Sequence, residues 1–208
     1  MTLELWIPFA LAAALVLIIP GPTVILVVSQ ALSHGRRSVA PLAAGVVLGD
    51  FTAMTLSLLG LGALLSASAA LFTLFKWAGA LFLIFLGIRM IVSSPRQNPA
   101  PGKATRASGR SLFKSSFVTT ALNPKSIAFF VAFLPQFMDP LKPALAQMTT
   151  LGATFLFLAG VNAALFAFFA GRLGEQMRKK SVRKWLNRLG GSALIGAGIL
   201  TAGMRRAP

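Results

Sequence analysis

Long apolar runs, nearly bare of charge, alternate along this chain with short basic loops. A helix needs roughly 20 mostly apolar residues to cross the hydrocarbon core of a bilayer, and six runs meet that length. Overall 56% of the residues are hydrophobic and only 12% are charged, too few charges for the surface of an ordinary soluble domain. Lipid offers no partner to backbone N–H and C=O groups, so each run is predicted to be an α-helix.

We therefore expect an all-α, polytopic membrane protein with six transmembrane helices. The predicted spans are Leu5–Ala31, Val39–Leu65, Ala69–Val92, Ser111–Phe137, Pro143–Gly171 and Trp185–Met204. Region 94–110 consists mainly of Pro, Gly, Ala, Ser and basic residues, which cannot build a core, so we predict a flexible basic cytoplasmic linker there. The linker separates a first three-helix repeat, residues 1–93, from a second, residues 111–208.

The basic residues give the orientation. The formal net charge is +16, from 20 Lys and Arg against 4 Asp and Glu. Two, six and seven basic residues follow the first, third and fifth spans, and only four lie on the opposite side. Lys and Arg mark cytoplasmic loops, so both termini are predicted to be periplasmic. The same distribution explains the charge without nucleic acid, which we do not expect as a partner.

Several kinds of chemistry are excluded by composition. The chain has no Cys and no Tyr, and its one His is His34, which we expect to be exposed in a basic loop. Disulfides, Cys-based metal sites and His-rich metal or catalytic sites are therefore excluded. The chain also lacks HExxH, GxSxG and P-loop motifs. We predict that the protein is not an enzyme and holds neither a cofactor nor a metal.

Three spans in each half imply two halves of opposite orientation, a common plan among transporters. The helix breaks support such an inverted repeat. The first span is interrupted by Pro20-Gly21-Pro22 and the fourth by Asn123-Pro124. Polar residues also correspond: Asp50 lies within the second span and Asn162 within the fifth. The alternative is coincidence, because Gly and Pro are common in membrane helices.

The broken helices leave backbone groups without partners. Proline has no N–H and its ring displaces the carbonyl four residues earlier, so the breaks should free the carbonyls of Val16, Ile18 and Thr120. The half-helices that restart near Thr23 and Lys125 present unpaired N–H groups and a positive dipole end. We expect the two breaks to meet near the bilayer midplane and to hold a carboxylate there. The alternative is a pair of structural kinks with no ligand.

Two charges are predicted to lie inside the membrane. Asp50 is placed about twelve residues into the second span, where a charge costs at least about 2.5–3.5 kcal/mol, so it is a functional candidate. Lys125 is its natural partner. One interpretation gives Asp50 a role in substrate or proton handling, and the other is a buried Asp50–Lys125 pair that only clamps the halves together. Asn162 is a further polar candidate.

The ordered motifs resemble the lysine exporter and homoserine–threonine resistance (LysE/RhtB) family. They are the Pro20-Gly21-Pro22 break, the series Gly35, Gly45 and Gly49-Asp50, the segment Lys76-Trp77-Ala78-Gly79-Ala80 with Leu86-Gly87, and the stretch from Asn123-Pro124-Lys125 to Phe133-Leu134-Pro135-Gln136-Phe137. The resemblance implies an exporter of amino acids or their derivatives in the bacterial inner membrane, with six helices and proton antiport. It leaves the exported amino acid open.

Together, these observations favour a secondary active amino-acid exporter that alternates access between its halves. In this hypothesis the N–H groups after Pro22 and Pro124, helped by Lys125, bind the carboxylate, while freed carbonyls and Asp50 bind the ammonium. Asp50 also carries the proton. The predicted substrate-binding residues are Pro20, Gly21, Pro22, Thr23, Asp50, Asn123, Pro124, Lys125 and Asn162. The alternatives are a metal-cation exporter of related topology and a non-transporting membrane scaffold. The GxxxG pattern Gly45–Gly49 permits a homodimer without requiring one.

The predicted orientation can be tested by labelling a single cysteine in intact cells. Lys103→Cys places a thiol in the predicted cytoplasmic linker, and the native chain has no competing thiol. We expect an impermeant maleimide to label it only after the cells are opened. A cysteine at Lys142, predicted to be periplasmic, is the positive control. Labelling of Lys103→Cys in intact cells would contradict the orientation.

Overall fold

The computed structural model describes residues 2–67, 69–92, 107–139, 141–170, 172 and 179–203, and all of its regular structure is helical. The helices in the first half are α1 (Leu3–Ile18), α2 (Pro22–His34), the 3₁₀ turn η1 (Gly35–Ser38), α3 (Val39–Ala67) and α4 (Ala69–Val92). Those in the second half are α5 (Gly109–Ala121), α6 (Pro124–Ala128), η2 (Phe129–Phe133), η3 (Leu134–Phe137), α7 (Ala144–Phe168) and α9 (Lys180–Gly203). The all-α prediction is confirmed for this part of the chain. Most of the predicted linker, residues 94–106, lies outside it.

By length and composition, two helical stretches of the described residues are long and apolar enough to cross a bilayer. They are Pro22–Gly60, which runs from α2 through η1 into α3, and Ala144–Phe168. The segments Gly109–Ala121 and Pro124–Phe137 qualify as a third span if taken together, with a bend of 43° between them. The predicted first span is divided, and its first piece, α1, has only 16 residues. The six-span arrangement therefore stays a prediction.

Both predicted breaks lie where the sequence placed them. α1 ends at Ile18 and α2 begins at Pro22, and the N-cap of α2 is Gly21. α5 ends at Ala121 and α6 begins at Pro124, and the Asn123 side chain accepts a hydrogen bond from the Lys125 N–H as the N-cap. Proline is favoured at the first position of a helix because it has no N–H to leave unpaired. Pro22 and Pro124 therefore start new helices rather than kink continuous ones.

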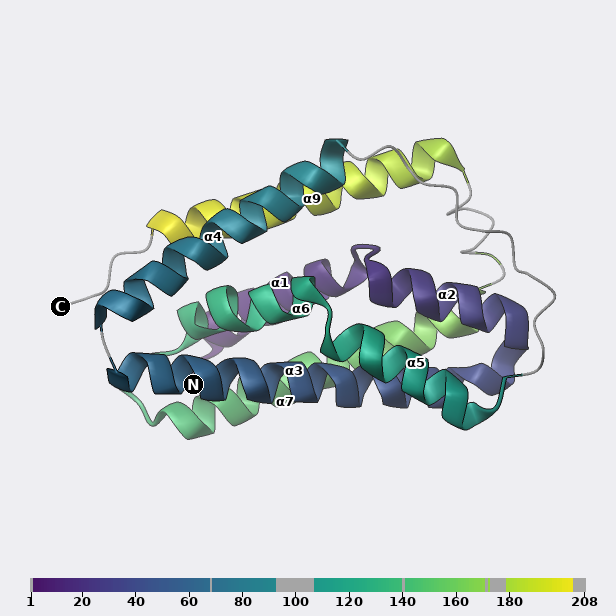
Figure 1. Cartoon of the computed structure of the whole chain (residues 1–208), viewed down its shortest axis with the longest axis horizontal. Coiled ribbons are helices and arrows are strands. Elements are labelled where there is room, and N and C mark those ends of the chain that lie inside the picture. The colour runs from purple at the N-terminus through teal and green to yellow at the C-terminus, as the bar shows by residue number, and fades with distance from the viewer. Residues whose placement is uncertain are drawn as a thin grey trace.

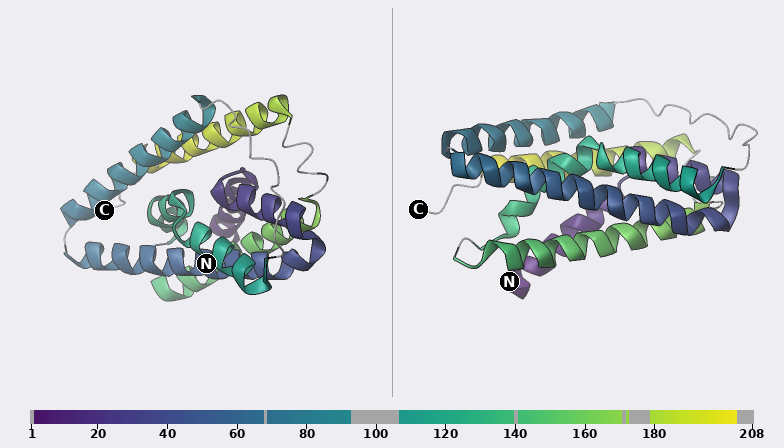
Figure 2. Two further views of the ribbon diagram at one scale, coloured as in Figure 1. Left: turned by 45° about the vertical axis from the view of Figure 1, so that its right-hand side comes forward. Right: turned by 60° about the horizontal axis from the view of Figure 1, so that its bottom comes forward.

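Helices α4 and α9 run antiparallel, side by side, and form a layer over the other helices (Figure 1; Figure 2). Glycines bring their backbones together. A Cβ atom on Gly87 would lie 2.5 Å from the Gly191 carbonyl oxygen, and one on Gly198 would lie 2.7 Å from the Ala80 carbonyl oxygen. Small residues allow this kind of approach between helices that face lipid.

Helix α3 packs closely against α5 through the predicted GxxxG pattern. A Cβ on Gly45 would overlap Ser116 Oγ, and one on Gly49 would lie 2.7 Å from the Phe117 carbonyl oxygen. The other side of α3 packs against α7. The pattern therefore serves packing within the chain, which leaves it unable to mediate a homodimer in this conformation.

An aromatic cluster fills the end of the core where α1, η2 and α7 meet. Phe130 and Phe155 make an edge-on contact with ring centroids 4.8 Å apart, and Phe129 packs on both of them. Phe9 joins the cluster from α1 and is fully buried. The residues of η2 adopt π-helical geometry, a form that appears mostly as single-turn bulges and often at functional sites.

The α3–α5 contact can be tested with two glycines of the same helix. Gly49→Ala places a methyl group against Phe117 and Thr120, and such overpacking costs about 1–3 kcal/mol. At Gly60 an added Cβ meets nothing within 4 Å, and alanine is favoured over glycine within a helix. In thermal unfolding of detergent-purified protein we expect a lower Tm for Gly49→Ala and an equal or higher Tm for Gly60→Ala. Equal Tm values for both variants would refute the close contact.

Candidate functional site

The two helix breaks meet at one buried site. Thr23 Oγ1, just after the first break, lies 3.1 Å from Asn123 Nδ2, which donates to it from the second break. The same hydroxyl lies 3.2 Å from Thr120 Oγ1 at the end of α5. Asn123 and Thr120 are almost fully buried. Polar side chains that are buried and satisfied by each other fix one arrangement of the surrounding helices, so the breaks are held in a defined register.

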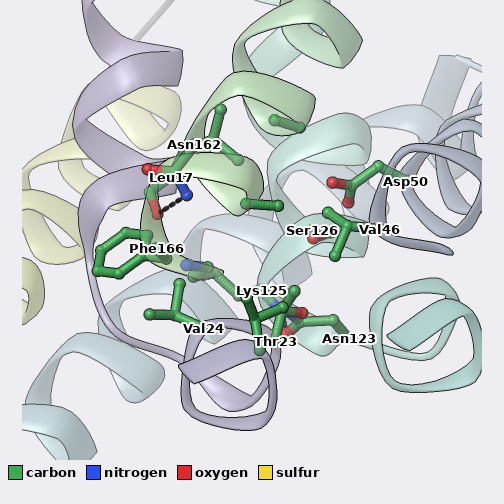
Figure 3. A pocket seen from close by; sticks show the side chains of 13 residues that line it. Leu17, Thr23, Val24, Val46, Asp50, Asn123, Lys125, Ser126, Asn162 and Phe166 are labelled. Carbon is green, nitrogen blue, oxygen red and sulfur yellow. Dashed lines mark hydrogen bonds between the residues drawn. The ribbon is translucent and has the colours of Figure 1, made fainter. Parts of the chain in front are cut away.

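Carbonyls at the first break accept hydrogen bonds from the second half of the chain. Lys125 Nζ donates to the carbonyl oxygens of Val16 and Ile19, both at 3.0 Å. Asn162 Nδ2 donates to the Leu17 carbonyl oxygen at 3.1 Å (Figure 3). In a continuous helix the donor to Val16 would be the N–H of residue 20, which is a proline and has none. The sequence therefore predicts the free carbonyl of Val16 correctly.

The other acceptors at the breaks differ from the prediction in two ways. Lys125 also donates to the carbonyl of Ile19, the C-cap of α1, which the proline positions did not single out. The Thr120 carbonyl is not free, since it accepts the Asn123 N–H at 3.0 Å. The second break closes as a turn whose backbone groups are satisfied locally. The first break is the one that supplies acceptors.

Asp50 is buried in the same site, with only 2% of its surface exposed. The carboxylate interacts with the Ser126 hydroxyl, while Oδ1 has no hydrogen-bond partner. Figure 3 shows Ser126 beside the carboxylate. Helix α3 positions Asp50 rigidly because its neighbour Gly49 is in close contact with α5. A buried acceptor without a partner is rare and calls for an explanation.

No ion pair joins Asp50 and Lys125 within the described residues. The ammonium is engaged by the carbonyls of the first break, and the carboxylate by Ser126. The pair still interacts through space, because both groups line one cavity. The direct clamp considered above is therefore not formed in this conformation.

The cavity between these groups is small, about 30 Å³. That volume accommodates one or two water molecules and is smaller than any amino acid. Five predicted site residues line it: Thr23, Asp50, Asn123, Lys125 and Asn162. The remaining wall is mostly apolar and comes from Leu17, Val24, Val27, Val46, Ser126, Ala159, Ala163 and Phe166.

Four predicted site residues do not line the cavity: Pro20, Gly21, Pro22 and Pro124. Pro22 and Pro124 are exposed and act by starting helices. Gly21 lies next to the site, since a Cβ there would be 3.4 Å from Lys125 Nζ. These residues shape the backbone instead of contacting what the cavity would hold.

Sequence reasoning missed Ser126 and the apolar wall. Ser126 is two residues beyond Pro124, so its place just after a helix break was a usable signal. Ala159 and Ala163 flank Asn162 at helical spacing, which puts small residues on the same face of α7. Val46 precedes Asp50 by one helical turn of α3. The bulky Phe166 carries no such signal, because nothing distinguishes it from the other phenylalanines of the chain.

His34 also differs from expectation. It is half-buried rather than exposed, and its Nε2 accepts the Ala107 N–H at 3.1 Å while Nδ1 lies 2.9 Å from the Gln30 carbonyl oxygen. An accepting Nε2 leaves the proton on Nδ1, which donates to Gln30. His34 thus fixes the residues just before α5 to the end of α2.

The profile of the LysE type translocator family matches residues 14–204, nearly the whole chain. The chain belongs to this family. This LysE-type protein is 34% identical over 207 residues to a homoserine/homoserine lactone efflux protein of Salmonella typhi, with all of both chains covered. It is 33% identical to a leucine efflux protein of Enterobacter sp. (strain 638), over 76% of this chain and 71% of the relative.

A further relative is an uncharacterized membrane protein of Vibrio cholerae, 32% identical over 97% of this chain and 98% of its own. No solved structure matches the LysE-type chain. Membership of a translocator family establishes that the protein is a transporter and not an enzyme, as its sequence motifs predicted.

Proposed function

We propose that this LysE-type protein is a secondary active transporter that exports amino acids or amino-acid derivatives across the bacterial inner membrane. The observation that carries the proposal is one buried cavity lined by a carboxylate, an ammonium and freed carbonyls, at the point where two broken helices meet. The efflux proteins to which the chain is similar point to the same class of substrate.

The relatives also indicate which substrate group matters most. Homoserine, homoserine lactone and leucine all carry a primary α-ammonium, whereas the lactone has no free carboxylate. A site of this kind must therefore recognise the ammonium first. Asp50 and the freed carbonyls offer oxygen acceptors for it, and the apolar wall of Val46, Ala159 and Phe166 offers a place for a short uncharged side chain.

For substrates that have a carboxylate, the start of α2 is the better binding site of the two predicted. No side chain caps this helix, so its first N–H groups, at Thr23 and Val24, are available beside the cavity. The start of α6 is already capped by Asn123. Lys125 lies close to both and supplies the positive charge once it leaves its carbonyl partners.

The proposed architecture is six spans in two inverted three-helix repeats, residues 1–93 and 111–208. The helix contacts support it. Helix α3 of the first repeat packs on α5 of the second, and its counterpart α7 in the second repeat packs on α1 and α2 of the first. The counterparts α3 and α7 also contact each other, as do α4 and α9, and an inverted repeat requires such reciprocal contacts. Because the cavity is smaller than an amino acid, the proposed transport cycle alternates access by moving one half against the other about the two breaks.

The proposed membrane orientation puts both termini in the periplasm and the linker 94–110 in the cytoplasm, following the basic loops. The proposed coupling is proton antiport. Protonation of Asp50 from outside weakens its attraction for the substrate ammonium and releases it, and deprotonation toward the cytoplasm restores the site. The lipid bilayer is the only other partner required, and a homodimer is not needed to complete the cavity.

Two other functions remain to be distinguished. A metal-cation exporter would place several acids, Cys or His residues around one site, but within the described residues no three such side chains gather. A membrane scaffold has no need of a buried Asp50 with an unpartnered oxygen. Both alternatives give a different result in the following experiment.

The function can be tested with purified protein in liposomes. Liposomes loaded with unlabelled homoserine should accumulate external labelled homoserine by counterflow, and leucine should compete if the apolar wall holds an uncharged side chain. Protein-free liposomes are the control. Divalent-cation flux without counterflow would support the cation exporter, and neither activity would support the scaffold. Either result would refute the amino-acid exporter.

The role of Asp50 can be tested with Asp50→Asn, Lys125→Gln and the double variant. A clamp predicts that each single change costs about 3–5 kcal/mol by leaving one buried charge unpaired, and that the double change restores folding and export. Because no ion pair joins the two groups, we expect Asp50→Asn to fold and exchange substrate but to lose uphill transport driven by a pH gradient. The double variant should stay uncoupled.

The measurement is pH-gradient-driven uptake into inverted vesicles, beside exchange without a gradient. Asp139→Asn is the matched control, because this acid lies outside the cavity, in an ion pair of 3.4 Å with Lys142. Recovery of coupled transport in the double variant would rule out the proton role and restore the clamp.

A further inference from the structure

Lys125 binds the first helix break in the way an amino-acid substrate would. Its ammonium has two carbonyl oxygens at 3.0 Å, those of Val16 and Ile19, and the cavity beside it has a volume of only about 30 Å³. A primary ammonium group is the feature that Lys125 shares with any α-amino acid. The side chain therefore already occupies acceptors that an incoming ammonium would need.

Asp50 completes the comparison. Its Oδ1 is buried, has no hydrogen-bond partner and belongs to a residue that lines the same cavity. An ammonium that reached both this oxygen and the two carbonyls would satisfy all three acceptors. Lys125 reaches the carbonyls but forms no ion pair with Asp50, so the site satisfies Lys125 only in part.

We propose that the carbonyls of Val16 and Ile19, with Asp50, form the ammonium subsite, and that Lys125 is a tethered substitute for the substrate ammonium. The inference rests on the proposed function. When substrate enters, its ammonium displaces Lys125 Nζ, which is then free to bind the substrate carboxylate. When substrate leaves, Lys125 returns and again donates hydrogen bonds to the carbonyls of the first break.

The replacement of the substrate ammonium by Lys125 has a specific consequence for the transport cycle. An exporter must return across the membrane without substrate, and a break with unsatisfied buried carbonyls would be costly in that step. Lys125 satisfies those carbonyls in the carrier without substrate. It is thus required for net efflux, which includes the return of the unloaded carrier, but not for exchange, in which substrate occupies the site in both directions.

The alternative is that Lys125 is a permanent structural link between the two breaks. Lys125 belongs to the second half of the chain and makes buried contacts with the first, which fits that role as well. A structural link would be needed for every mode of transport, so the ratio of net efflux to exchange distinguishes the two.

The experiment compares two modes in liposomes, without a pH gradient and at saturating substrate. Lys125→Met removes the ammonium and keeps a flexible apolar side chain of similar length. We expect homoserine exchange to fall because the substrate carboxylate loses its positive partner, and downhill net efflux to fall by at least about tenfold more than exchange, within the range of typical couplings between sites. Lys114→Met, on an exposed lysine of α5, should change neither mode.

Chemical rescue adds a second measurement. Lys125→Ala leaves room at the carbonyls, and external ethylammonium should restore net efflux in this variant without affecting the wild type. If either lysine variant does not give monodisperse protein, Gly21→Val tests the same contact with Lys125 in place. Its branched side chain crowds the ammonium, since even a Cβ there would lie 3.4 Å from Nζ, and net efflux should again fall more than exchange.

An equal loss of exchange and net efflux in a folded variant, or no loss of either, would overturn the inference. The absence of counterflow in the wild type would instead refute the proposed function. The same assay therefore tests the proposed function with the wild-type protein and the role of Lys125 with the variants.

Discussion

A helix interrupted inside a membrane protein must find partners for its unpaired carbonyls, and the rest of this structure depends on how they are found. The residue after Ile19 is a proline without an N–H, so the helix cannot satisfy Val16 itself. Lys125 and Asn162 supply the missing donors from the other half of the chain. The same contacts thus hold the halves together, enclose the cavity and place an ammonium beside Asp50.

Much of this could be predicted from the sequence, because the signals were local. Each break has a proline at the start of the new helix, preceded by Gly21 in the first break and by Asn123 in the second, and both breaks lie where expected. The glycine pattern at Gly45 and Gly49 likewise predicts a close helix contact, although it does not predict that the other helix is α5. The free carbonyl of Val16 follows from the missing N–H of one proline.

What the sequence could not provide was the pairing of groups far apart in the chain. Opposite charges inside a span suggest an ion pair between Asp50 and Lys125, yet the ammonium has a competing set of acceptors 106 and 109 residues away. Which acceptor the Lys125 ammonium binds depends on the path of α6 past α1, and no local sequence pattern encodes that path. The apolar wall was missed for the same reason, since burial in a cavity and burial in a core look alike along a chain rich in Val, Ala and Phe.

The glycine contacts separate the parts of this molecule that tolerate change from those that do not. Where α3 meets α5, and where α4 meets α9, backbone touches backbone and only a hydrogen atom fits at the contact. The cavity wall, by contrast, is made of side chains such as Val46, Ala159 and Phe166, whose size can change without moving those contacts. Selection can therefore reshape the pocket on α3 and α7 one side chain at a time while the glycines preserve the frame, so a single scaffold can diverge toward differently shaped cargo.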